Sequence, residues 1–163
     1  MLPFKDNVFD FSYSIGVLHH TPDPGLGIKN IYRCLKENSE FAIALYGEGS
    51  YYDFPTITLW RNIFNFTWKI FGAIPPLLYT YIFVSIIWPI GKISRYASFP
   101  FRLFFPIANL PDIRWSYLDT FDSITPSYQS THNAYQVQNF FIDAGFKEGR
   151  STNWGSTSYK AKK

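Results

Sequence analysis

The chain has 163 residues, of which 47% are hydrophobic, 21% aromatic and only 17% charged. This composition excludes a disordered chain, a collagen-like chain and a coiled coil, and the length fits one domain of ordinary size. Lys and Arg number 15 against 12 Asp and Glu, a net charge of +3, and three of the cations lie in the last four residues. The body of the chain is therefore nearly neutral, which excludes the basic surface typical of a nucleic-acid-binding protein.

Cysteine content and the first residues favour a cytoplasmic location. The single cysteine, Cys34, can form no intrachain disulfide, and no charged-then-apolar signal pattern opens the sequence. Cys34 lies beside Leu35 at the end of an apolar stripe, so we predict a small buried residue rather than a nucleophile.

The first part, residues 1–50, has the pattern of a strand, a helix and a second strand. Residues 8–17 form a β-branched and aromatic run of strand length, and residues 25–37 have apolar side chains at helical spacing with Asp23 placed to cap them. Residues 41–46 are a short apolar run typical of a buried strand. A strand, a helix and a strand at this spacing predict a βαβ unit with two parallel strands.

The middle part, residues 51–111, is strongly apolar, and residues 70–91 contain no charge. This length reaches the threshold for a membrane span, but three prolines interrupt it and leave residues 77–88 as the clean helical stretch, about 18 Å against a hydrocarbon core of ~30 Å. Cations and aromatic residues flank the segment, as in helices that lie in a membrane interface. We interpret the part as a helical cap on the sheet or as such an interfacial element, and a true span is a weaker alternative.

The third part, residues 112–163, returns to ordinary composition. Residues 133–144 have helical spacing, with Thr131 or Asn133 as the amino-terminal cap and Gly145 after the last turn. Two short strands around Gly155 are predicted to follow, over residues 146–154 and 156–161.

Three segments together resemble a known family. They are LPFKDNVFD at residues 2–10, SIGVLHHTPDP at 14–24 and IYRCLK at 31–36. In this order and spacing they resemble the carboxyl-terminal part of a class I S-adenosylmethionine-dependent methyltransferase of the type 11 kind. The segment FFIDAGF at residues 140–146 is similar to the last helix and the following turn of the same family.

The resemblance implies an α/β fold with a Rossmann-like methyltransferase sheet whose amino-terminal half is missing, and with residues 51–111 as a helical apolar insertion. It also implies S-adenosylmethionine as cofactor. The cofactor-binding residues that it implies are Ser14, Ile15, Gly16, His19 and His20. The family's glycine-rich cofactor loop would precede Met1, so we expect a truncated methyltransferase that does not bind the cofactor tightly by itself.

His19, Tyr128 and His132 are the candidate catalytic residues, with Tyr46 as a further candidate, because methyl transfer asks the protein to position the acceptor and at most to remove a proton. His19 has a plainer interpretation as a hydrogen-bonded loop histidine. Neighbouring side chains of an extended segment point to opposite sides, so we expect no metal site at His19 and His20. The segment from Asp119 and Asp122 to Tyr128 and His132 has loop composition, and it is either a solvated connection or part of a lid over the acceptor.

The expected reaction is methyl transfer to a small or lipid-like acceptor. Expected partners are that acceptor, a membrane surface contacted through residues 69–92, and either a second copy of the chain or the missing amino-terminal half. No nucleic acid is expected. The alternatives are a noncatalytic module that works at a membrane surface or in protein interaction, and a fragment without a function of its own.

Overall fold

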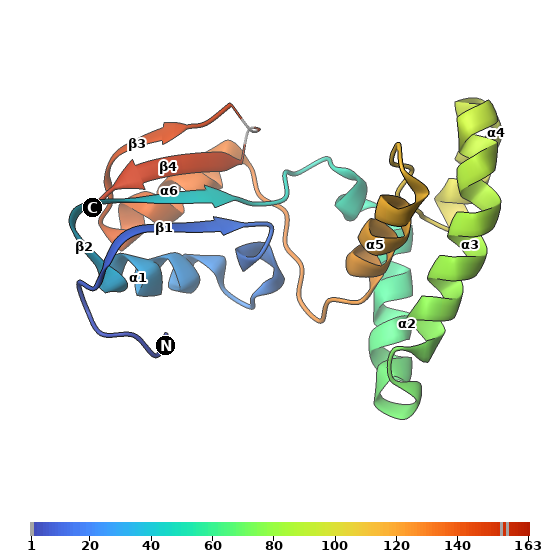
Figure 1. Cartoon of the computed structure of the whole chain (residues 1–163), viewed down its shortest axis with the longest axis horizontal. Helices are drawn as coiled ribbons and strands as arrows, with labels where there is room; N and C mark the ends of the chain where they lie inside the picture. Colours follow the sequence, from blue (N-terminus) through green and yellow to red (C-terminus); the bar gives the residue numbers. More distant parts are fainter. Residues whose placement is uncertain (1, 154, 156) are drawn as a thin grey trace. The chain divides into compact units, whose positions relative to one another are not determined.

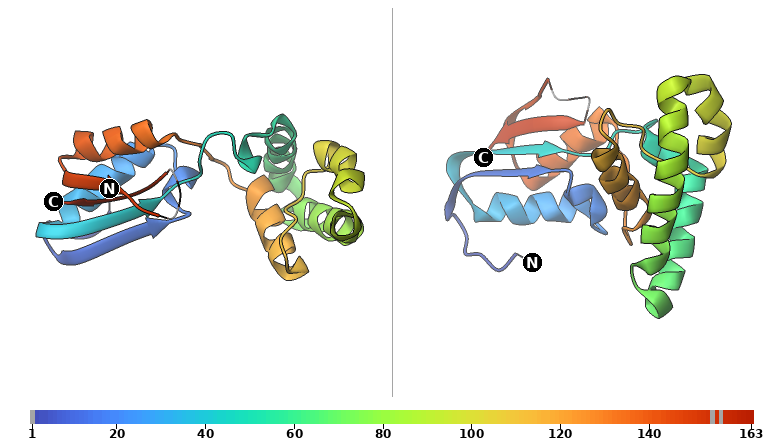
Figure 2. Two further views of the ribbon diagram at one scale, coloured as in Figure 1. Left: turned by 90° about the horizontal axis from the view of Figure 1, so that it is seen from above. Right: turned by 45° about the vertical axis from the view of Figure 1, so that its right-hand side comes forward.

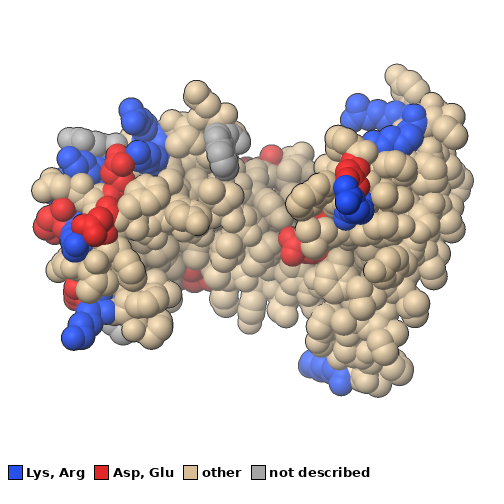
Figure 3. Space-filling view, in the orientation of Figure 1, with Lys and Arg blue, Asp and Glu red and all other residues tan. Residues whose placement is uncertain are grey.

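The computed structural model describes residues 2–153, 155 and 157–163. It divides into two compact units, each described by itself below (Figure 1). The sheet unit comprises residues 1–50 and 128–163, and the helical unit comprises residues 51–127. On the face seen in Figure 3, charged side chains are frequent on the sheet unit, whereas much of the helical unit shows none.

The sheet unit is built on four strands in the order β1-β2-β4-β3. The strands are β1 (Phe9–Ile15), β2 (Leu35–Ala44), β3 (Lys147–Ser151) and β4 (Ser158–Lys162). β1 and β2 are parallel, and the other two pairs are antiparallel. The mixed α/β fold and the parallel βαβ unit are therefore confirmed. β3 and β4 form the predicted hairpin around Gly155, of which Trp154 and Ser156 lie outside the described residues.

Two helices, α1 (Pro24–Cys34) and α6 (Ala134–Ala144), cover one face of this sheet (Figure 2). Both begin where the sequence predicts, because Asp23 and Asn133 accept hydrogen bonds from backbone N–H groups of the first turn. Gly145 ends α6 with a φ of 98°, a conformation that glycine adopts without steric cost.

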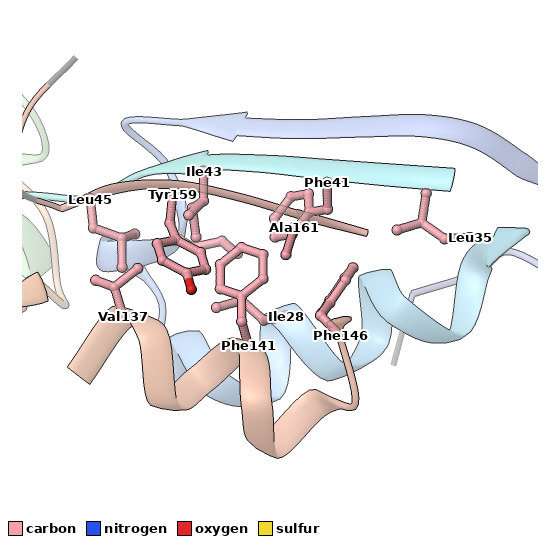
Figure 4. Close-up of a cluster of buried hydrophobic side chains, with 11 residues drawn as sticks. Ile28, Leu35, Phe41, Ile43, Leu45, Val137, Phe141, Phe146, Tyr159 and Ala161 are labelled. Atoms are coloured by element: carbon pink, nitrogen blue, oxygen red, sulfur yellow. The ribbon is translucent and has the colours of Figure 1, made fainter. Parts of the chain in front are cut away.

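The core of the sheet unit lies between the sheet and these two helices. Figure 4 shows Phe41 and Ile43 of β2 pointing towards Ile28 of α1 and Phe141 of α6. The rings of Phe41 and Phe141 stack with their centroids 5.4 Å apart. Cys34 is buried, as predicted. The opposite face is not covered in the same way, because alternate side chains of β1 are exposed there: Phe9, Phe11, Tyr13 and Ile15.

The junction between α1 and β2 differs from the prediction. The helix ends at Cys34 instead of near Asn38, and β2 begins at Leu35, which is fully buried in the core. The residues that follow Leu35 make a bulge, since the pairing moves from Phe9↔Leu35 to Phe11↔Glu40, and Asn38 has a φ of 65°. Burial of Leu35 in the sheet and the left-handed turn at Asn38 outweigh the helical pattern of residues 35–37.

The helical unit contains four α-helices among its described residues. They are α2 (Pro55–Phe71), α3 (Ile74–Ile93), α4 (Arg95–Phe104) and α5 (Ile113–Ile124), preceded by the single turn η2 (Tyr51–Asp53). α3 packs against the other three. Two small buried clusters hold the helices together, one around Phe64, Tyr79 and Ile124 and one around Val84, Ile87 and Ile107.

Helix α3 is longer than the sequence predicts. The predicted clean stretch is 77–88, but the helix begins at Ile74 and continues through Pro89 to Ile93. Pro75 and Pro76 stand in the first turn, where the backbone N–H has no helical partner to lose, and Pro89 removes one hydrogen bond near the last turn. Its 20 residues, about 30 Å, are long and apolar enough to cross a membrane by length and composition.

The helical unit also extends past Pro111 to Ser127, because α5 packs on α2 and α3. Asp119 and Asp122 therefore lie on a helix, and the prediction that they belong to a loop with Tyr128 and His132 is wrong. Asp119 accepts a hydrogen bond of 3.0 Å from the Tyr52 hydroxyl within the helical unit. Burial raises the pKa of the Asp119 carboxyl above its ordinary value.

Candidate functional site

The carboxyl ends of β1 and β2 lie side by side at one edge of the sheet unit, where α/β proteins commonly bind ligands. β1 ends in Ser14, which is buried, and Ile15, which is half exposed. Gly16 follows with a φ of 71°, and its N–H donates a hydrogen bond of 3.0 Å to the carbonyl of Ala44. A Cβ at Gly16 would meet no atom within 4 Å, so the space beside this backbone is open.

The turn after Gly16 carries two histidines into one aromatic cluster. The turn η1 (Leu18–His20) buries His19 completely, and its ring stacks on Tyr46 with centroids 3.6 Å apart. The ring of His20 meets that of His19 edge to face at 4.3 Å. Tyr46 comes from the segment that follows β2, so the cluster joins the ends of both parallel strands.

The segment 128–132, distant in sequence, closes on this cluster through hydrogen bonds. His20 Nδ1 donates to the Tyr128 carbonyl at 3.2 Å, and the Ser130 N–H donates to the His19 carbonyl at 2.9 Å. The His132 N–H donates to the Tyr46 carbonyl at 2.9 Å, which places the His132 backbone beside the continuation of β2.

The hydrogen bonds also set which ring nitrogens hold protons. The Ser130 hydroxyl donates to the His19 carbonyl at 3.3 Å, so Ser130 Oγ accepts from His132 Nε2 at 2.9 Å. Because the Tyr128 carbonyl can only accept, Nδ1 of His20 carries a proton, and in the uncharged form of the ring the lone pair is on Nε2. Three imidazoles are thus held in defined orientations by two strand ends and one loop.

Burial keeps two of these imidazoles uncharged. It lowers the pKa of His19 to about 3, and His20 and His132 add electrostatic repulsion of a proton on that ring. The pKa of His132 is also lowered by burial, against the opposing effects of Gln136 and the Glu48 carboxylate. Near pH 7 His19 and His132 are therefore neutral.

The buried nitrogens of the cluster are unusual. Within the described part of the chain, Nδ1 and Nε2 of His19 and Nε2 of His20 have no hydrogen-bond partner. An unpartnered buried polar atom costs roughly 1–3 kcal/mol, so three together mark a place that packing alone does not explain. The interpretation of His19 as a hydrogen-bonded loop histidine is wrong for its side chain.

The structure brings together most of the residues singled out from the sequence. His20, Tyr128 and His132 meet around His19, and Ser14 and Gly16 precede them at the end of β1. Sequence reasoning missed Ser130, which links His19 to His132 and whose only sequence signal is its place two residues before a histidine.

The fit to the implied cofactor is partial. Open space beside Gly16 and the exposed Ile15 suit the close approach of a ligand backbone such as the methionine part of S-adenosylmethionine. His19 is buried beneath Tyr46 and His20, so in this arrangement it contacts no ligand directly.

Residues 1–43 match a family model described as a methyltransferase domain. Among solved structures, a possible exported protein from Bordetella parapertussis is similar with 12% identity and a TM-score of 0.50, over 98% of this chain and 40% of that one. A SAM-dependent methyltransferase from Methanosarcina mazei is similar with 16% identity and a TM-score of 0.45, over 100% of this chain and 63% of that one. Likeness at these identities concerns the fold alone. No curated protein sequence matches the chain.

Proposed function

We propose, from the premise that residues 1–43 belong to the methyltransferase-domain family, that this chain is part of an S-adenosylmethionine-dependent methyltransferase. The observation that carries the proposal is the edge at Gly16, where a left-handed glycine with open space follows a parallel strand inside the segment that matches the family. The methionine part of the cofactor lies against Ser14, Ile15 and Gly16 in this proposal.

The rest of the cofactor site is supplied by protein outside these 163 residues, either a segment of the same polypeptide or another chain. The uncovered face of β1 supports this part of the proposal. Its alternate side chains, Phe11 and Tyr13 among them, are 51% and 68% exposed, although a strand of a parallel sheet normally has both faces covered. β1 is also an edge strand, so its outer backbone groups can pair with a further strand.

The histidine cluster supplies the proton acceptor where the methyl acceptor must lose a proton. His20 is the candidate, because the Tyr128 carbonyl fixes the tautomer that leaves Nε2 as acceptor, and this nitrogen has no hydrogen-bond partner among the described residues. His132 and Ser130 position the loop that holds that carbonyl. We propose a small or lipid-like acceptor, and the apolar side chains that the helical unit exposes support the lipid-like alternative.

Titration of the isotopically labelled chain with ligand fragments tests the cofactor assignment. Methionine at millimolar concentration is expected to shift the backbone NMR signals of residues 14–16, whereas adenosine leaves them unchanged. Gly16→Asn is the matched control, since asparagine tolerates a positive φ and its side chain enters the open space, which removes the response. Adenosine shifts without methionine shifts at these residues would contradict the assignment. Once the protein that supplies the rest of the cofactor site is present, label from methyl-labelled S-adenosylmethionine is expected in lipid-extractable products, and label confined to water-soluble products would contradict a lipid-like acceptor.

A noncatalytic module is the second candidate function. It is favoured by the helical unit, where α3 is apolar on its buried and exposed sides alike. The fragment titration separates the two functions, because a module without cofactor chemistry gives no methionine response at Gly16.

A further inference from the structure

The helical unit has an unusual distribution of charge. Residues 54–111 contain five cations and no Asp or Glu. Arg61 is buried, and the other four are Lys69, Lys92, Arg95 and Arg102. In the part of the chain that the structure describes, none of the five forms an ion pair with a carboxylate, unlike Arg114 of α5, which pairs with Asp112 at 2.6 Å. The five cations thus have no ion-pair partner among the described residues, and the unit as a whole holds six cations against four carboxylates.

Two residues of α4, Arg95 and Arg102, line two neighbouring cavities. One, of about 250 Å³, is walled mostly by apolar and aromatic side chains: Tyr51, Phe54, Phe99 and Leu103 together with Arg95 and Arg102. The other, of about 380 Å³, is polar and is lined by Gly91, Lys92 and Asn109 with the same two arginines. Arg95 and Arg102 are seven residues apart on one helix and therefore lie on the same side of it. Within the described residues Nε of Arg102 is buried without a hydrogen-bond partner.

An acidic amphiphile fits this pair of cavities. Guanidinium groups match phosphate geometry, and three cations around the polar cavity compensate the charge of a phosphate group. The apolar cavity on the other side of the two arginines suits the beginning of a hydrocarbon chain. A soluble phosphate compound would use the polar cavity alone.

Next to these cavities the unit exposes a long apolar surface along α3. Leu78, Tyr81, Ile82 and Ile86 are each more than half exposed, and Ile93 at its end is 89% exposed. Figure 3 shows a broad uncharged surface over α3, with basic side chains near its two ends. Trp88 near the end of α3 lies under the Lys92 ammonium at 4.9 Å. Apolar surface edged by cations and aromatic rings is the composition of a membrane-interface element.

We propose that the helical unit docks on the surface of an anionic bilayer, with the exposed side of α3 in the interface and the phosphate group of one phospholipid held by Lys92, Arg95 and Arg102. Charge complementarity selects this occupant over a second copy of the chain, because two copies would bring the same uncompensated cations together. The inference is independent of methyl transfer and holds for either function proposed above.

Surface docking rather than crossing follows from α5. This helix packs on α3, where the Tyr117 hydroxyl and Ser85 Oγ lie 2.8 Å apart. It carries Arg114, Asp119 and Asp122, which would enter the hydrocarbon core if α3 crossed the bilayer with α5 still attached.

Vesicle flotation of the full chain tests the proposal with two probes, phosphatidylcholine vesicles and vesicles of equal parts phosphatidylcholine and phosphatidylglycerol. We expect binding to the mixed vesicles, weakened by high salt, and little binding to phosphatidylcholine alone. Arg102→Gln is expected to weaken binding about fivefold, from roughly 1 kcal/mol for each basic residue near an anionic surface. Ile82→Ser with Ile86→Ser is expected to reduce binding further.

Arg114→Gln is the matched control, since it removes one cation of the same unit away from the cavities and should change binding less than twofold. Thermal unfolding of each variant shows that the fold is intact. Equal binding to both vesicle types, or equal effects of Arg102→Gln and Arg114→Gln, overturns the proposal. Three further outcomes overturn it. Resistance of the bound chain to carbonate extraction indicates a membrane span, and displacement of the chain from vesicles by millimolar inorganic phosphate indicates a soluble ligand. Self-association of the chain that the α3 variants abolish indicates a second copy as the partner.

Discussion

His19 is held in a position that opposes its protonation. The ring is fully buried on Tyr46, and burial lowers its pKa to about 3, from 6.5. The unfolded chain therefore binds a proton at His19 below pH 6.5, whereas the folded chain does so only near pH 3. This difference contributes stability that is fully present above pH 6.5 and is lost as the pH falls towards 3.

From pH 7.5 to pH 5 we expect His19 to lower the free energy of unfolding by about 2 kcal/mol. His19→Phe keeps a ring against Tyr46 and removes the titrating nitrogens. The wild type and this variant should therefore differ by about 2 kcal/mol in their change of stability between the two pH values. Urea unfolding followed by circular dichroism measures this difference. Identical pH dependence of the two proteins would show that His19 is not held neutral.

At the scale of single elements, helix α6 depends on its first turn. Asn133 accepts a hydrogen bond of 2.9 Å from the Gln136 N–H, and the Asn133 N–H donates one of 3.1 Å to Gln136 Oε1. The helix also positions His132, the residue just before Asn133, next to Tyr46. The start of α6 is therefore tied to the histidine cluster.

Asn133→Ala removes the cap, at a cost of about 1 kcal/mol, and should speed amide hydrogen exchange in the first turns of α6 about fivefold. Asn133→Ser is the control that retains a capping oxygen and should exchange at nearly the wild-type rate. The effect should extend to the amide of His132, which bonds to the Tyr46 carbonyl. Unchanged exchange in Asn133→Ala would mean that packing on the sheet alone holds this turn.

Helix ends that are set by a residue within one turn can be predicted from the sequence, whereas ends that depend on distant contacts cannot. Asp23, Asn133 and Gly145 act within one turn of their own position, so the start of α1 and both ends of α6 follow from the sequence. The end of α1 depends instead on burial of Leu35 against residues far along the chain. The predicted α3 is too short at both ends because the prediction treats every proline as a helix breaker. Pro75 and Pro76 stand in the first turn, where a proline costs no hydrogen bond, and packing on α5 supports the helix past Pro89.

The candidate site can likewise be predicted from the sequence only where local patterns define it. Gly16 and the two histidines after it follow from the strand-and-turn pattern and the family resemblance. The approach of Ser130 and His132 to His19 joins residues more than 100 positions apart, which no single-sequence periodicity reports. The resemblance to methyltransferases is confirmed by the family model for residues 1–43, and the cofactor and catalytic assignments within it stay predictions.

At the scale of the whole molecule, the open face of β1 is the feature that most affects behaviour in solution. Within the sheet unit the helices α1 and α6 cover one face of the sheet (Figure 2). The exposed side chains of β1 on the other face are apolar at every second position. Such a surface on an edge strand favours association with a further segment or a second copy. The isolated chain is therefore expected to associate as its concentration rises.

Phe11→Thr with Tyr13→Lys should shift this association to higher concentration, because a charge on an edge strand blocks pairing and both side chains are at least half exposed. Stability should change little, since neither side chain belongs to the buried core. Sedimentation velocity over a range of concentrations measures the effect. Ile82→Ser with Ile86→Ser, placed on α3, is the control that separates association through β1 from association through the helical unit. A wild-type chain that stays monomeric at every concentration would show that the open face of β1 needs no partner.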